Sequence, residues 1–423
     1  MKFFKSKTKQ IPLLALMLLF ITAGGCDGIL DVDDPGSIEE DQLRSPENEE
    51  LIVNGVRGQF QYTFSYSSLW AQMLTDELKM EHTFADYRPI ASREVDETNV
   101  ITENLFNFWA KSVRHAQDAV EYLEEFHGEE AWELHNMQKV LTYGGHSLIH
   151  YAEVFCEGTL DVSEAYTTDE LFGMAVDMFD DALEVADRLD ATDEVMEFRH
   201  LANLGMARAQ LNLGEMDQAA QYAAEVPEDF ESWLRYSDEN AREYNQTYGG
   251  ATESRFISPG SDFLGEDDIR VPHSDERVGN LVTGTDIYQV YSPLNYDGWD
   301  EEAPQTIQQS SDVRFATGLE ARYIRAEAEG PSGYTLDLVN ERRDFAGLDE
   351  VDYTGDELMA ELRYQKARDF FMTGTRLGDI RRYKNLYDVD YFPTGEVPLY
   401  GGNYGNVTCF PIPQSEINAN PNL

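Results

Sequence analysis

The sequence predicts an all-α protein, built as a tetratricopeptide-like helical-repeat scaffold that carries long irregular loop insertions. Three observations predict this fold class. Apolar residues recur at spacings of three and four over most of residues 50–228, and again over 318–385. One helical hairpin at 196–226 has small residues where two helices would cross. Between these parts, residues 229–311 are rich in Gly, Pro, Asn, Asp and Tyr and keep no sustained period.

The first helices are expected in the N-terminal half of the chain. The apolar pattern predicts them at residues 51–60, 69–80, 100–126, 130–155 and 169–189. Asp169 is a plausible N-cap for the last of them. The pair Gly144 and Gly145 interrupts the helix at 130–155, and a close contact with another helix would explain its presence.

The helical hairpin at 196–226 carries the repeat signal. Small residues allow two antiparallel helices to approach, and Gly214 turns the chain between them. Because a single repeat cannot bury its own apolar face, the helices at about 130–190 are expected to form a preceding pair. The positions that match the repeat are Ala207, Ala209, Leu213, Gly214, Ala219, Ala220 and Ala223.

The C-terminal part is predicted as further helices at 318–328, 336–346 and 356–385, followed by Pro- and Gly-rich coil to residue 423. An irregular insertion as long as 229–311 is usually functional in a compact protein. We therefore expect one domain over 26–423. In it, residues of about 50–228 form the scaffold, 229–311 the loop-rich insertion, and 312–423 the C-terminal helices and coil packed on the scaffold.

The first 25 residues have the layout of an export signal. Four lysines precede an apolar run at 11–21, which is too short to span a bilayer comfortably. Small residues then lead to Cys26 in a segment that resembles a bacterial lipobox, with Ala23 where Leu is usual. The resemblance implies that residues 1–25 are removed and that Cys26 is lipidated, so that a lipid anchor holds the protein to a membrane. A plain signal peptide cut near the same place is the alternative.

The chain is strongly acidic, with 80 Asp and Glu against 32 Lys and Arg and a formal charge of -48. Such a surface repels phosphates, so no nucleic acid partner is expected. The acids are spread along the chain without the spacing of a calcium loop, which favours adaptation to a saline habitat, although a bound calcium ion stays open. Cys156 and Cys409 either form a disulfide or stay as two buried thiols, and the sequence leaves both open.

Several short segments together resemble the SusD/RagB family of nutrient-binding outer-membrane lipoproteins. Each is weak alone, but their order and spacing are specific and the resemblance covers essentially the full mature length. The segments are 26–32, 317–328, 338–340 with Arg343 and 346–348, 367–371 with Gly374, Arg376, Leu377, Asp379, Arg381 and Arg382, and 410–413 with Glu416, Asn420, Pro421 and Asn422.

The motif residues themselves are read as structural. Glu320, Arg322, Arg325 and Glu327 are expected to pair along one helix face. Arg376, Asp379, Arg381 and Arg382 are expected to tie the last long helix to the C-terminal coil, where guanidinium groups would satisfy backbone carbonyls.

The resemblance implies a non-enzymatic lipoprotein on the outer membrane, facing the cell exterior. Such proteins capture an oligomeric nutrient, here a glycan in preference to a peptide, and deliver it to a SusC-like TonB-dependent transporter. No cofactor is implied. Two alternatives stay open: a glycan-degrading hydrolase on a helical scaffold, and a structural repeat protein of the envelope that binds no small ligand.

Candidate ligand-binding residues come from chemistry, because pocket residues vary within the family. Sugar rings offer apolar C–H faces to aromatic planes and hydroxyls to Asn, Asp and Arg. Two aromatic loop segments, 81–93 and 288–299, fit this requirement. The alternative is that these aromatic residues pin their own loops to the helices. The candidates are Tyr87, Arg88, Tyr291, Asn295, Tyr296 and Trp299.

Enzymatic motifs are absent from the sequence: it contains no G-x-S-x-G, P-loop or H-E-x-x-H pattern. His146, His150 and Glu153 share one helical face at metal-ligand spacing. We expect these histidines to pack within the repeat, and no metal site is predicted.

Overall fold

The computed structural model describes residues 44–81, 84–264, 268–274, 278–279, 286–290, 306–398 and 401–423. The chain divides into two compact units, Met1–Asn48 and Glu49–Leu423. The described part of the first unit contains one short 3₁₀ helix, η1 (Pro46–Asn48). Within the described ranges, none of the helices combines the length and apolarity that crossing a bilayer requires.

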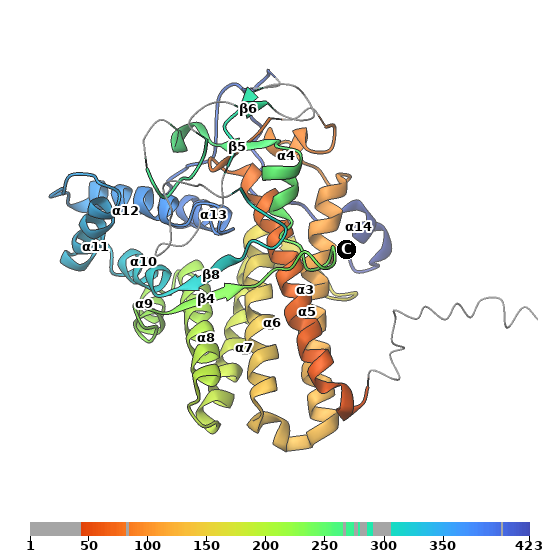
Figure 1. Ribbon diagram of the computed structural model, residues 1–423. Helices are drawn as coiled ribbons and strands as arrows, with labels where there is room; N and C mark the ends of the chain where they lie inside the picture. The colour runs from red at the N-terminus through yellow and green to blue at the C-terminus, as the bar shows by residue number, and fades with distance from the viewer. Residues whose placement is uncertain are drawn as a thin grey trace, which may run out of the picture. The chain divides into compact units, whose positions relative to one another are not determined.

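The second unit is built on a stack of helices, as the sequence predicts (Figure 1). Consecutive helices pack against each other along the chain, and the pairs α6 with α7 and α8 with α9 form the two predicted hairpins. The 3₁₀ helix η3 (Gly128–Glu133) connects α5 to α6. The scaffold helices are α3 (Glu49–Trp70), α5 (Val100–His127), α6 (His135–Val154), α7 (Thr168–Arg188), α8 (Asp193–Asn212) and α9 (Met216–Ala224).

Glycines set the spacing between α6, α7 and α8. Phe179 of α7 is fully buried, and a Cβ atom on Gly145 would lie 2.7 Å from its ring, one on Gly205 only 2.2 Å. A Cβ atom on Gly144 would lie 2.8 Å from Met178. The predicted close contact at the glycine pair is confirmed. Gly214, with φ of +80°, turns the chain between α8 and α9 as expected.

The helix predicted at 69–80 is wrong. Helix α3 runs through to Trp70, a 3₁₀ turn η2 (Ala71–Leu74) follows, and Thr75 is extended. The chain then forms β1 (Leu78–Met80), which pairs antiparallel with β5 (Ile257–Pro259). Leu78 and Met80 are buried while Lys79 between them is not, which is the period of a strand.

The N-cap of helix α7 lies two residues before the predicted one, Asp169. Its N-cap is Thr167, whose hydroxyl accepts a hydrogen bond from the backbone N–H of Glu170. The Glu170 carboxylate in turn accepts from the backbone N–H of Thr167, which completes a capping box. Asp169 therefore lies in the first turn, where its charge favours the helix N-terminus.

The ends of the 229–311 insertion are joined by a two-stranded sheet. Strand β4 (Glu231–Leu234) pairs with β8 (Val313–Thr317), and Figure 1 shows them alongside each other in front of the scaffold. The described residues between them form short elements. These are the π helix η4 (Gly249–Glu253), β5, the 3₁₀ helix η5 (Ser261–Phe263) and the pair β6 (Val278–Gly279) with β7 (Asp286–Ile287).

The C-terminal helices build a second, smaller core. Helix α10 packs on α8 and α9, and α13 packs on α6. Buried residues of this core include Tyr323, Leu338, Val339, Leu358 and Leu362. The helices are α10 (Gly318–Glu329), α11 (Gly333–Phe345), α12 (Gly355–Asp369), α13 (Arg376–Tyr387) and the short α14 (Gln414–Ala419).

Three of the four charged residues predicted to pair along α10, Glu320, Arg322 and Glu327, do not do so, whereas Arg325 pairs within the helix, with Glu329 at 2.6 Å. Glu320 faces Arg208 of α8 at 3.5 Å, and Glu327 accepts two hydrogen bonds of 2.9 Å from Arg382 of α13. Arg322 pairs with Glu341 of α11. The prediction is wrong because these side chains point toward different neighbouring helices, which sequence spacing on one helix does not reveal.

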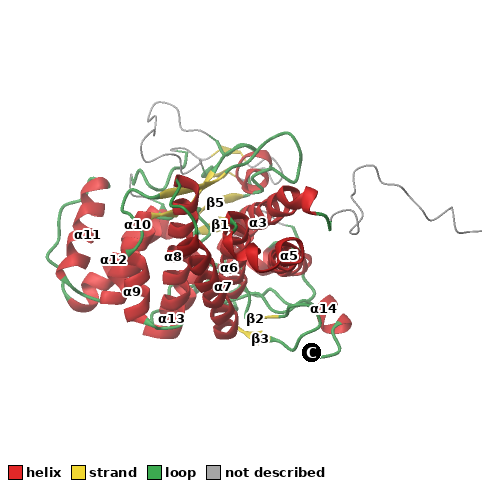
Figure 2. Ribbon diagram, turned by 90° about the horizontal axis from the view of Figure 1, so that it is seen from below, coloured by secondary structure: helices red, strands yellow, loops and turns green. Residues whose placement is uncertain are grey.

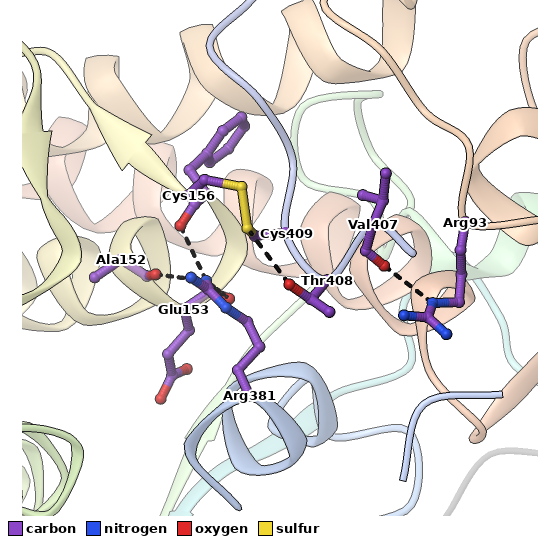
Figure 3. Close-up of a disulfide and its surroundings, with 9 residues drawn as sticks. Arg93, Ala152, Glu153, Cys156, Arg381, Val407, Thr408 and Cys409 are labelled. Carbon is purple, nitrogen blue, oxygen red and sulfur yellow. Dashed lines mark hydrogen bonds between the residues drawn. A yellow bond between two sulfur atoms is a disulfide. The ribbon is translucent and has the colours of Figure 1, made fainter. Parts of the chain in front are cut away.

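Arg381 of α13 holds the C-terminal end of α6. Its Nη1 donates to the carbonyl oxygens of Ala152 (2.8 Å), Glu153 (2.6 Å) and Phe155 (2.9 Å). Figure 3 shows Arg381 beside Ala152 and Glu153. The guanidinium group does satisfy backbone carbonyls, but they belong to α6 and not to the C-terminal coil. These carbonyls have no partner within the helix, so the arginine completes its end.

The C-terminal coil is fastened to the same place by a disulfide. Cys156 and Cys409 are bonded, with Cα atoms 5.2 Å apart and a sequence separation of 253 (Figure 3). On either side, the Cys156 N–H donates to the Phe410 carbonyl and the Phe410 N–H to the Val154 carbonyl. A small antiparallel pair, β2 (Glu157–Gly158) and β3 (Tyr166–Thr167), follows α6.

Candidate functional site

The β1–β5 ribbon brings together the described segments that lead into the two predicted ligand-binding loops. Strand β1 leads into the segment 81–93. On β5, Ser258 pairs with Lys79 of β1 and also donates from its hydroxyl to the Tyr288 carbonyl at 3.1 Å. The segment 286–290, which leads into the second predicted loop, therefore lies against the strand that pairs with the first. Figure 2 shows β1 and β5 side by side.

Tyr87 belongs to an aromatic cluster at one end of this ribbon. Its ring centroid lies 4.4 Å from that of Trp70, 5.4 Å from Phe256 and 5.1 Å from Phe84, with the last contact edge to face. Trp70 is buried, Tyr87 is half-buried and Phe84 is exposed. Burial raises the pKa of the Tyr87 hydroxyl. The ring thus holds the 81–93 segment to α3 and still reaches the surface.

Tyr87 and Arg88 lie at the start of α4 (Arg88–Ala91), a single turn that presents them beside the cluster. Arg88 is exposed. The other predicted ligand residues, Tyr291, Asn295, Tyr296 and Trp299, lie outside the described residues, as does Cys26.

Arg93, at the end of the same segment, has a structural task. It is buried, adopts a φ of +58°, and donates from Nε to the Val407 carbonyl (3.0 Å, Figure 3) and from Nη1 to the Pro393 carbonyl (2.7 Å). Its guanidinium lies over the Phe392 ring. The end of the loop is therefore fixed to the C-terminal coil, so that residues near Tyr87 are held in place.

A cleft that the sequence did not predict lies at the other end of the β1–β5 ribbon. Its volume is about 560 Å³. It is lined by one face of α12 together with residues of η5, the start of α13 and Tyr391. The signal was a stripe of aromatic and charged residues at helical spacing on α12. The lining residues are Asp76, Asp262, Phe263, Tyr353, Glu357, Ala360, Glu361, Arg363, Tyr364, Ala367, Arg368, Arg376 and Tyr391.

The histidines of α6 are packed as expected. His146 is buried between the rings of Phe179 and Phe315, and its Nε2 lies 3.1 Å from the Leu201 carbonyl oxygen. Burial lowers the pKa of His146 to about 3. His150 stacks on Trp109. Across the described ranges, no group of three His, Cys, Asp or Glu is placed to hold a metal ion.

Glu153 of α6 forms a bidentate ion pair with Arg208 of α8. Arg208 donates to both of its carboxylate oxygens, from Nε at 2.8 Å and from Nη2 at 2.7 Å. Both side chains are buried. Burial raises the pKa of Glu153, but Arg208 and His150 outweigh it and lower the pKa to about 2. The carboxylate is therefore charged and fully engaged.

Comparison with known proteins places the fold. Residues 319–423 match the model of the SusD family. No curated protein sequence matches the chain. Among solved structures, a SusD superfamily protein from Parabacteroides distasonis aligns with a TM-score of 0.68 at 16% identity, covering 89% of this chain and 98% of that one. A SusD superfamily protein from Bacteroides vulgatus gives a TM-score of 0.65 at 16% identity, with 89% and 97% covered. Surface glycan-binding protein A from Bacteroides uniformis gives 0.64 at 15%, with 90% and 99% covered.

Proposed function

Because this chain belongs to the SusD/RagB family, we propose that it binds a glycan at the cell surface and delivers it to a SusC-like TonB-dependent transporter. The carbohydrate ligand is supported by similarity of fold to the surface glycan-binding protein of Bacteroides uniformis. The protein would act by binding alone, without a cofactor.

The observation that carries the proposal is the meeting of two loop-bearing segments at β5. Residues 81–93 and 286–290 are far apart in the sequence, yet hydrogen bonds to Lys79 and Tyr288 join them to the same strand. Tyr87 stands beside this junction with part of its ring accessible. An aromatic plane with neighbouring polar groups suits a sugar, whose C–H face stacks while its hydroxyls accept and donate hydrogen bonds.

We place the ligand between these segments, in contact with Tyr87 and Arg88 from the first. From the second it would meet the aromatic and amide groups that follow Val290 in the sequence. These are Tyr291, Asn295, Tyr296 and Trp299.

The test is glycan binding by the mature protein. Electrophoresis in gels that contain starch, xylan, mannan or mixed-linkage β-glucan identifies a ligand, and calorimetry then measures its affinity. Trp299→Ala and Arg88→Ala should each weaken binding about tenfold or more, which corresponds to about 1.4 kcal/mol. Trp132→Ala, far from the junction on η3, is the matched control and should bind normally. If both Trp299→Ala and Arg88→Ala bind the glycan with unchanged affinity, the glycan does not bind at these two loop segments.

The two competing functions give different readouts in the same experiment. A hydrolase would release shorter sugars from the bound glycan, and chromatography of the incubated mixture detects them. A structural repeat protein would migrate at the same rate in gels with and without glycan. A peptide carrier would retain peptides from a protein digest instead. Intact glycan that elutes unchanged supports the binding function.

Anchoring is proposed to depend on Cys26. Removal of residues 1–25 and lipidation of Cys26 would leave residues 26–423 as one domain, tethered to the outer membrane and facing outward. Protease added to intact cells should then digest the protein. A Cys26→Ala variant should leave the membrane fraction. If that variant stays with the outer membrane, the transporter and not the lipid holds the protein.

A further inference from the structure

The cleft beside α12 is the strongest unassigned feature of the described residues. Helix α12 has two faces. Leu358 and Leu362 point into the C-terminal core, whereas Glu357, Tyr364 and Arg368 line the cleft. These three positions are spaced by seven and four residues, so they form one stripe along the helix. The volume of the cleft, about 560 Å³, is within the range of sites for small ligands, about 300–1,000 Å³.

Arg368 and Tyr364, which line the cleft, are fixed by contacts with other parts of the protein. Arg368 lies 3.4 Å over the centroid of Tyr364 and 5.3 Å from that of Phe263. Its Nη2 donates to the Asp262 carbonyl at 2.8 Å, and Asp268 is 3.7 Å away. A binding surface that is already ordered loses little side-chain entropy when a ligand arrives.

A bidentate ion pair orders another part of the lining, where α13 begins. Arg376 donates from Nε and Nη2 to the two carboxylate oxygens of Asp76, at 2.8 and 2.6 Å. Tyr391 lies against the same guanidinium. The lining therefore combines aromatic rings with two arginines, Arg368 and Arg376, that already have partners inside the protein.

This charge arrangement favours an uncharged ligand with many hydroxyl groups. Arg376 pairs with Asp76 and Arg368 lies near Asp268, so neither offers an uncompensated charge to an anion, and the chain's formal charge of -48 repels one. The lining also places four acidic residues beside three arginines, so it favours neither sign of charge strongly. Arg363 also lines the cleft, and its guanidinium lies over the rings of Tyr383 and Tyr387, which hold it in place.

The cleft and the Tyr87 cluster lie at opposite ends of one short ribbon. Strand β5 begins at Ile257, next to Phe256 of the aromatic cluster, and ends at Pro259, just before η5 and the cleft. The antiparallel partner β1 begins at Leu78, shortly after Asp76 of the cleft. Three residue pairs of ribbon extend over about 7–10 Å, which a few linked sugar units can span.

We propose that this cleft is a second subsite for a neutral oligosaccharide, which stacks on Tyr364 of α12 and on Tyr353 just before that helix, while other units of the same chain occupy the loop site near Tyr87. The inference rests on the proposed glycan-binding function. It adds that affinity should increase with the length of the oligosaccharide.

Calorimetry with disaccharides and hexasaccharides of the starch, xylan, mannan and cellulose series tests the proposal. Wild-type protein should bind the hexasaccharide of its preferred series at least tenfold more tightly than the disaccharide. Ala360→Trp, at an exposed position in the wall, fills the cleft and should remove that advantage while disaccharide affinity stays the same. Tyr353→Ala, at a second exposed wall position, should reduce hexasaccharide affinity in the same direction.

The matched control is Ala224→Trp, the same change at an exposed position on α9, and denaturation curves confirm that each variant is folded. Hexasaccharide affinity that is unchanged in Ala360→Trp and Tyr353→Ala overturns the subsite but leaves the glycan-binding function standing. A wild-type protein that binds no sugar of any series overturns both. If the wild-type protein binds peptides from a casein digest and Ala360→Trp abolishes that binding, the ligand of the cleft is a peptide and the proposal of a sugar ligand is overturned.

Discussion

Arg208 and Glu153 form a bidentate ion pair inside the scaffold, where α8 and α6 meet. The pair is also a junction, because Arg208 reaches Glu320 of α10 at 3.5 Å and Asn212 donates to Glu153 at 3.2 Å. A buried carboxylate is tolerated only while it keeps such partners. The charge pair therefore links the repeat helices to the C-terminal helices.

Arg208→Met is expected to destabilise the protein by about 3–5 kcal/mol, because it leaves the buried charge of Glu153 without its main partner. Since the folded pKa of Glu153 is lowered to about 2, the pair's contribution is present above the unfolded pKa and is lost as pH falls toward 2. Urea unfolding should show a large difference from wild type at pH 7 and a smaller one at pH 3.

The comparison variant is Arg188→Met, which removes an exposed partner of Glu184 and should cost no more than about 1 kcal/mol. An Arg208→Met loss as small as that of Arg188→Met would contradict the role given to the buried pair.

The sequence predicts the scaffold well because its signals are local. Periodicity locates α5, α7 and the α8–α9 hairpin, and the pair Gly144 and Gly145 marks a close contact before any partner is known. Strand β1 is missed because its residues also fit a helical spacing. What makes it a strand is β5, nearly 180 residues later in the chain, which no local pattern includes.

The candidate site is less predictable for the same reason. Loop composition points to Tyr87, but its contacts with Trp70 and Phe256 depend on where α3 and β5 end. The cleft at α12 needs Asp76, Asp262 and Tyr391 from three separate segments. Pairing of Glu327 with Arg382 is likewise a property of helix packing and not of spacing within α10.

Gly205→Ala should destabilise the scaffold by about 1–3 kcal/mol, because the added methyl group would lie 2.2 Å from the ring of Phe179, which is enclosed on all sides. Gly173→Ala in α7 is the matched control. Its methyl group would meet nothing within 4 Å, so the higher helix propensity of Ala should stabilise by up to about 1 kcal/mol. Thermal unfolding with opposite signs for the two variants is the expected result, and a stabilised Gly205→Ala would refute the close packing.

Loss of the Cys156–Cys409 disulfide should lower the free energy of unfolding by about 2–4 kcal/mol, since the bond closes a loop of 253 residues in the unfolded chain. Urea unfolding with and without dithiothreitol measures this difference. The Cys156→Ser/Cys409→Ser double variant should match the reduced wild type and should not respond to dithiothreitol. A wild type that is equally insensitive would mean that the bond does not form.

Glu77 is expected to make the protein less stable as pH rises from about 4.5, its ordinary pKa, to about 8. Its side chain is fully buried beside η2, Oε1 accepts from the Met372 N–H at 3.1 Å, and Oε2 has no hydrogen-bond partner among the described residues. Burial raises the pKa of Glu77 to about 8, so the carboxyl is mostly neutral at pH 7. A folded pKa above the unfolded value gives a contribution that is complete at low pH and is lost as pH rises through about 8.

In Glu77→Gln the side chain keeps its shape and the oxygen that accepts from Met372, but it cannot ionise. Relative to wild type, this variant should gain stability between pH 5 and pH 9, by as much as about 1.4 kcal/mol per pH unit between the two pKa values. Guanidinium unfolding at pH 5, 7 and 9 measures the gain, and the exposed Glu350→Gln corrects for removal of one carboxylate. A constant difference between Glu77→Gln and wild type across this range would show that Glu77 is already ionised in the folded protein at pH 5, and that the buried end of η2 accommodates its charge.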